Sequence, residues 1–167
     1  MKIELRIEES WMPEFIDRSY DPDDDDIRSI LWDVCQTIGQ RGDFLVSGFG
    51  QDRWPVDVQT DLPGFLEQLP SVIVAIGDTM PAEIEFYEQG VERSINFTPC
   101  KDIYVATCTS ATMTCWKTDS FVEEIGHEEL YKMLSDIKDR FVGFMDCAAP
   151  GLIEHPWVKQ WLKGVYE

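Results

Sequence analysis

Basic residues are scarce in this sequence of 167 residues: 14 lysines and arginines stand against 32 aspartates and glutamates, so the formal net charge is −18. Such a chain is repelled by a nucleic-acid duplex and by an anionic membrane surface. Long apolar runs are also absent, because the longest, at 72–76, is far shorter than the ~20 residues that span a bilayer. We therefore expect a protein that binds neither nucleic acid nor membranes.

The beginning of the sequence lacks the unbroken apolar segment of a secretory signal, because charged and aliphatic residues alternate there. Cysteine pairs are absent as well. The five cysteines are odd in number and form no C-x-x-C pair, which argues against a zinc site and against a dithiol redox site. They are Cys35, Cys100, Cys108, Cys115 and Cys147. A cytoplasmic protein with reduced, mostly buried thiols fits this pattern best.

Catalytic and metal-binding motifs are missing. The sequence has two histidines, and His127 fails the H-E-x-x-H pattern because Tyr131 stands where the second ligand is needed. A calcium loop counted from Asp21 would place Asp26 at the glycine position and Trp32 at the glutamate position, so the EF-hand pattern also fails. We expect no enzyme, no metal and no cofactor. His127 is expected to be exposed at a helix start, and His155 to cap a helix.

The residues that are present predict one α+β domain over 1–167, with an antiparallel sheet and helices packed on one face. Alternating apolar residues predict strands at 2–8, 44–49 and 103–109, and shorter ones at 56–58, which would pair with 44–49, and at 112–117. Helical spacing predicts helices at 27–38, at 62–69, from 128 to 149 and at 156–162. The apolar run at 72–76 fits either a continuation of the second helix, which we favour, or a buried strand. Aspartates before the first helix and Asp61 before the second are placed to cap them, and Pro70 is expected to interrupt or kink the second.

The clearest local pattern is a tight hairpin at 82–97, in which Gln89 and Gly90 form a two-residue loop. This loop pairs Phe86 with Arg93 and Ile84 with Ile95. One face of the hairpin is then apolar. The opposite face carries Glu83, Glu85, Tyr87, Glu92, Ser94 and Asn96.

Two features suggest a binding surface. Six tryptophans are many for one domain, and tryptophan is enriched at interfaces; Trp54 lies in a polar turn and is expected to be exposed. Clustered carboxylates repel one another, and a cationic partner would relieve that repulsion. The candidate partner-binding residues are Asp23, Asp24, Asp25, Asp26, Asp52, Trp54, Glu83, Glu85, Tyr87 and Glu92.

Three strings carry a family resemblance: EFYEQGVER at 85–93, RWPVDV at 53–58 and LEQLP at 66–70, with an echo in HPWV at 155–158. Over residues 53–97 the chain resembles small bacterial proteins encoded near polymorphic toxins. It is similar to immunity proteins of contact-dependent or type VI secretion systems. The resemblance implies a stoichiometric inhibitor, often of a nuclease, that covers the active site of its toxin. It assigns no toxin-contacting residue.

The charge agrees with this implication, because an acidic protein can fill the basic substrate groove of a nuclease toxin, with steered association approaching ~10⁸ M⁻¹s⁻¹. We therefore expect an immunity protein that binds and neutralises a cognate toxin with a basic surface. The alternative is an acidic adaptor or scaffold protein without a toxin partner.

Overall fold

The structure, a computed structural model, describes residues 1–88, 90–110 and 120–164, and its strands form two antiparallel sheets. The first sheet pairs β1 (Lys2–Ile7) with β2 (Gly42–Ser47). The second has the order β3 (Ala82–Phe86), β4 (Arg93–Cys100), β5 (Ile103–Ser110) and β6 (Val122–Gly126). The helices are α1 (Ile27–Ile38), α2 (Asp61–Gly77), α3 (His127–Ala148), the short 3-10 helix η1 (Leu152–Glu154) and α4 (Pro156–Leu162). The predicted α+β class is confirmed, although the strands divide into two sheets.

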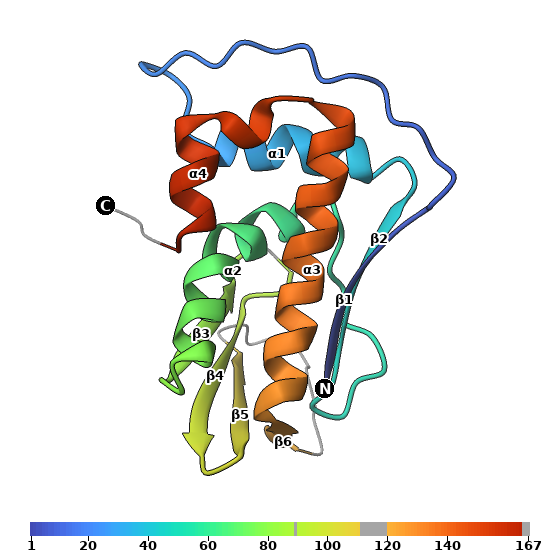
Figure 1. Ribbon diagram of the computed structural model, residues 1–167. Coiled ribbons are helices and arrows are strands. Elements are labelled where there is room, and N and C mark those ends of the chain that lie inside the picture. The colour runs from blue at the N-terminus through green and yellow to red at the C-terminus, as the bar shows by residue number, and fades with distance from the viewer. Residues whose placement is uncertain (89, 111–119, 165–167) are drawn as a thin grey trace.

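Helices α2 and α3 lie side by side against one face of the four-stranded sheet, and β1 and β2 lie on the other side of α3 (Figure 1). The carboxylate of Glu123 on β6 joins the two sheets. It accepts a hydrogen bond from the backbone N–H of Phe49, just after β2, and forms an ion pair with the amino group of Met1. One carboxylate therefore fixes the position of both strands of the smaller sheet relative to β6.

The predicted helices are confirmed, and residues 72–76 belong to α2. The expected interruption at Pro70 is wrong, because α2 is one helix from Asp61 to Gly77. Asp26 is the N-cap of α1, and its side chain accepts a hydrogen bond from the N–H of Arg28 at 2.8 Å. The start of α2 differs from the prediction. Asp57 organises it, because its carboxylate accepts hydrogen bonds from the N–H groups of Gln59 and Thr60, whereas Asp61 is the first helical residue and accepts from the N–H of Asp57.

The predicted register of the hairpin is confirmed: Ile84 lies opposite Ile95 and Phe86 lies opposite Arg93. Strand pairing ends at Phe86 and resumes at Arg93, and the N–H groups of Val91 and Glu92 both bond to the carbonyl of Glu88. The predicted two-residue loop includes Gln89, which lies outside the described residues.

Three strand predictions need comment. Residues 56–58 do not form a strand, because β2 pairs with β1 and the buried side chains of Val56 and Val58 fill the core from a loop. The predicted strand at 112–117 lies outside the described residues. Strand β6 was missed, because only Ile125 of its five residues is buried, so its sequence carries no clear alternation.

Helix α2 remains continuous through Pro70, and α4 supplies the reason. Proline has no N–H, so the carbonyl of Leu66, four residues earlier, receives no helical hydrogen bond from position 70. The indole Nε1–H of Trp161, on α4, donates to that carbonyl at 2.8 Å in a buried position. The carbonyl that Pro70 leaves without a helical hydrogen bond is therefore the group to which α4 binds.

We predict that Trp161→Phe lowers the free energy of unfolding by about 1–3 kcal/mol, because the buried carbonyl of Leu66 loses its donor. The matched background is Pro70→Ala, whose new N–H can bond to Leu66 within the helix. In that background, Trp161→Phe should lower the free energy of unfolding by less. Urea unfolding of the four proteins measures the difference, and an equal cost in both backgrounds would contradict the assignment.

Candidate functional site: an acidic hairpin surface

Trp54 is not exposed, which corrects the prediction. It is 1% exposed, and its ring lies against Phe49 and Phe86, with centroids 6.1 and 5.4 Å away. Its backbone N–H donates to the carbonyl of Val46 at 2.7 Å, which folds the polar turn back onto β2. The neighbouring polar residues point outward while the tryptophan points inward. Trp54 is therefore a core residue and contacts no partner directly.

The buried side of the hairpin carries a cation that sequence reasoning overlooked. Arg93 is 7% exposed, because its pairing with Phe86 turns its side chain toward the core. Its guanidinium carbon lies 4.6 Å from the centre of the Trp54 ring, and Nη1 donates to Oε1 of Gln51 at 2.8 Å. Burial lowers the pKa of Arg93. The one base of the hairpin therefore faces inward, so its positive charge does not offset the glutamates outside.

We predict that Trp54→Ala lowers the free energy of unfolding by about 3–5 kcal/mol, because a large buried ring is replaced by a cavity. The matched control is Trp32→Ala, since Trp32 is 45% exposed and should cost less than about 1 kcal/mol. Urea denaturation measures both values. Similar costs for the two variants would show that Trp54 does not occupy the core.

The opposite face of the hairpin is acidic. Glu83 and Glu85 project from β3 on the sheet face away from the helices, and Glu88 and Glu92 lie in the connection to β4. We call these four glutamates, together with Tyr87, the acidic hairpin surface. None of the four forms an ion pair with a residue that the structure describes.

The neighbours across the sheet are neutral. Asn96 donates its amide to Glu83 at 3.1 Å, and Ser94, which lies opposite Glu85, bonds to Thr109 at 2.7 Å. Glu83 and Glu85 are two strand residues, or about 7 Å, apart, and unit charges at that distance in water repel by about 0.6 kcal/mol. The fold tolerates that cost, while an approaching cation gains from every glutamate at once.

Helix α2 closes the outer edge of β3. The side chain of Gln68 accepts from the N–H of Glu85 at 2.8 Å and donates to its carbonyl at 2.9 Å, which reproduces the two hydrogen bonds of a neighbouring strand. The Gln68 amide also donates to the carbonyl of Gly64 at 2.8 Å. The acidic hairpin surface is thus fixed to a rigid helix. No local sequence pattern predicts this contact, because Gln68 and Glu85 are 17 residues apart.

Tyr87 is the apolar contact of this surface, because 54% of it is exposed. Its ring lies over Gly64, where any larger side chain would collide: a β-carbon there would be 2.5 Å from the Tyr87 hydroxyl oxygen. The hydroxyl lies 3.5 Å from Glu67, which forms an ion pair with Arg28 at 2.7 Å. Partial burial raises the pKa of Tyr87, and the charge of Glu67 adds to the effect.

The aspartate-rich segment before α1 approaches the same region, because Arg28 follows the cap Asp26 by two residues. Two of its four predicted contacts serve the fold. Asp26 caps α1, and Asp25 pairs with Arg18 at 2.6 Å and accepts from the N–H of Asp21 at 3.0 Å; this backbone hydrogen bond is the main reason that the pKa of Asp25 is lowered. Asp23 and Asp24 remain exposed.

Asp52 and Glu92 lie on two segments that are joined through their sequence neighbours, because Arg93 donates to Gln51 in the hydrogen bond described above. Asp52 is exposed and Glu92 is half-buried. The predicted residues therefore lie on three segments: the hairpin, the turn after β2 and the aspartate-rich segment before α1.

The two histidines and the two buried cysteines serve the fold as well. His127 is half-buried, not exposed as predicted, because its Nε2 lies 2.8 Å from the carbonyl of Ile76 at the end of α2. The predicted capping role of His155 is confirmed, since its Nδ1 accepts from the N–H of Trp157. Cys35 and Cys108 are buried, and burial raises the pKa of the Cys108 thiol to about 12. Cys100 and Cys147 are exposed, and Cys115 lies outside the described residues.

Across 1–88, 90–110 and 120–164, no three histidine, cysteine, aspartate or glutamate side chains converge as metal ligands would. In the same part of the chain, no helix is both long enough and apolar enough to cross a bilayer. Comparisons of the chain with protein-family models, with curated proteins and with solved structures find no match in any of the three.

We predict a thermodynamic coupling between Gly64 and Tyr87. In a Tyr87→Ala background, Gly64→Ala should stabilise the protein by up to about 1 kcal/mol, because alanine favours the helix over glycine. In the wild-type background the new methyl group must displace the Tyr87 ring, so the gain should shrink or become a loss. Urea unfolding of the four proteins measures the coupling. Equal effects in both backgrounds would mean that the ring does not rest on Gly64.

Proposed function

We propose that this protein binds a basic partner protein through the acidic hairpin surface and neutralises it, as an immunity protein does with its toxin. The observation that carries the proposal is the set of four glutamates on the acidic hairpin surface, none of which has an ion-pair partner among the described residues. That the partner is a toxin is inferred from the resemblance of residues 53–97 to immunity proteins.

The arrangement suits rapid capture of a basic surface. Exposed like charges on one face steer an oppositely charged protein and raise the association rate, whereas apolar contacts slow dissociation. Tyr87 supplies such an apolar contact, and it is positioned by Gly64 and Glu67 of α2. Because Gln68 fixes β3 to the same helix, the glutamates and the tyrosine are already in place before the partner arrives.

The function is tested by co-expressing the chain with the protein encoded immediately upstream of its gene. We expect that protein to inhibit growth when produced alone, and this chain to restore growth and to co-purify with it in equal amounts. Absence of both protection and binding would contradict the proposal. Binding of a neutral partner that persists at high salt, without growth inhibition, would instead favour the adaptor alternative.

The surface is tested with Glu83→Lys/Glu85→Lys, which reverses two exposed charges. We predict a 10- to 100-fold loss of affinity, mainly through slower association, and a weaker dependence of binding on salt. The matched control is Glu9→Lys/Glu14→Lys, which makes the same charge change at exposed positions of the segment after β1. Surface plasmon resonance at two salt concentrations measures both variants. An equal loss in the control would show that net charge, not this surface, determines binding.

A further inference from the structure

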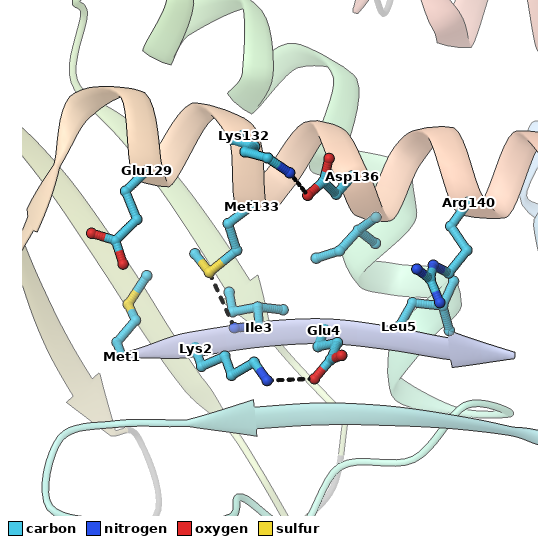
Figure 2. Close-up of a pocket in the computed structure, with 11 residues that line it drawn as sticks. Met1, Lys2, Ile3, Glu4, Leu5, Glu129, Lys132, Met133, Asp136 and Arg140 are labelled. Atoms are coloured by element: carbon cyan, nitrogen blue, oxygen red, sulfur yellow. Dashed lines mark hydrogen bonds and ion pairs between the residues drawn. The ribbon is translucent and has the colours of Figure 1, made fainter.

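A groove of about 450 Å³ separates β1 from α3, and its volume is within the usual range of ligand sites. Figure 2 shows β1 on one side and α3 on the other, with Met133 reaching from the helix toward Ile3. Side chains one turn or two turns apart on α3 form one wall, at Glu129, Met133, Asp136 and Arg140. The opposite wall is the outer edge of β1.

The outer edge of β1 is an unpaired strand edge. In an antiparallel pair, the backbone groups of successive residues point alternately toward the partner strand and away from it. The N–H of Ile3 points away from β2, because it donates to the sulfur of Met133 at 3.2 Å. The same alternation turns the backbone groups of Leu5 and Ile7 toward the groove. Among the described residues, β1 has β2 as its one neighbouring strand.

The edge strands β3 and β1 differ in the hydrogen-bond partners that their outer backbone groups have. At the edge of β3, Gln68 provides both an acceptor and a donor for Glu85, so that edge is closed. At the edge of β1, Ile3 has a thioether, which is a weak acceptor on a flexible side chain. A peptide carbonyl is a stronger acceptor and would replace the sulfur. Met133 thus contacts the outer edge of β1, but among the described residues that edge lacks the strong hydrogen-bond partners that Gln68 gives to β3.

The two ends of the groove carry side chains of opposite charge. Glu4 pairs with both Lys2 and Arg6, and Lys132 pairs with Asp136, so the charged side chains in the middle of the groove already have partners. Glu129 near Met1 and Arg140 near Leu5 mark the two ends (Figure 2), and neither forms an ion pair with a described residue.

Eleven helical residues separate the two end charges, or about 16 Å at 1.5 Å per residue. A strand covers that distance in about five residues at 3.3–3.4 Å each. The spacing therefore matches a short extended segment that carries opposite charges near its two ends.

We propose that the β1–α3 groove binds an extended segment of a partner polypeptide as a third strand, antiparallel to β1. The segment carries an acidic residue near its N-terminal end, facing Arg140, and a basic residue four positions later, facing Glu129. Because successive side chains of a strand lie on opposite faces, these two charges share the face toward α3, and the apolar residues next to them lie on the other face. This mode of recognition takes its affinity from main-chain hydrogen bonds and its specificity from the alternating side chains.

This site is independent of the acidic hairpin surface, because β1 and β3 belong to different sheets. The groove therefore admits a partner whatever the outcome of the co-expression test, and failure of one proposal leaves the other standing.

The test uses the full chain and two labelled peptides of identical composition, TEVTVKT and TKVTVET. We predict that the first binds with a dissociation constant below about 1 mM and at least 5-fold more tightly than the second, as measured by fluorescence anisotropy. In amide NMR spectra the signals of Ile3 and Leu5 should shift most. Absence of binding by both peptides up to a few millimolar, or equal binding by both, would overturn the proposal.

The charge assignment is tested with Glu129→Arg/Arg140→Glu, which exchanges the two end charges and leaves the net charge unchanged. We predict that this variant prefers TKVTVET by a similar factor. A reversed preference cannot arise from misfolding, because the variant must fold in order to bind. An unchanged preference would refute the proposed direction of the segment.

The strand pairing is tested in two ways. Methylation of the central backbone nitrogens of TEVTVKT should weaken its binding at least 10-fold, because the methyl groups remove donors to β1. Met133→Leu removes the sulfur that competes for the Ile3 N–H while it keeps the volume of the side chain, so it should tighten binding 2- to 5-fold. Full binding by the methylated peptide would exclude strand addition.

Discussion

The packing around Trp54 holds the two sheets and α2 together. Its ring contacts Phe86 of β3, and Phe86 in turn stacks with Phe65 of α2, whose ring lies 5.2 Å from that of Phe44 on β2. The sheet of β1 and β2 could not form a stable core alone, because a two-stranded sheet is marginal in water. The aromatic rings provide apolar contacts that connect both sheets with α2. The position of the hairpin, and of the glutamates on it, follows from this packing.

Helix α2 connects the core to the hairpin and to α4. Gln68 holds the edge of β3, Gly64 leaves room for Tyr87, and the missing N–H of Pro70 leaves a carbonyl for Trp161 on α4. Each contact depends on a residue that does not favour a helix or has a polar side chain at a partly buried position. Gly64 and Pro70 lower the intrinsic helix preference, and the tertiary contacts that they allow offset this cost.

Much of the fold could be predicted, because its elements are long and periodic. The stripe of Leu130, Leu134, Ile137 and Phe141 fixed α3, and the alternation at 82–97 fixed both the hairpin and its register. Prediction failed where an element is short or where its partner is distant. Strand β6 buries one residue of five, and β2 pairs with β1, which precedes it by 35 residues of chain from Ile7 to Gly42.

Some features of the candidate site could likewise be predicted from the sequence, and others could not. The sequence by itself determined the excess of carboxylates, the face on which Glu83 and Glu85 lie, and the exposure of Tyr87 in the hairpin connection, because these depend on composition and on a period of two. Only the tertiary structure decided that Trp54 is buried, that Arg93 faces inward, and that one strand edge is closed by Gln68 while the other meets a methionine. The reason is physical: a side chain's burial and partners depend on contacts between segments far apart in the chain, which local periodicity does not encode.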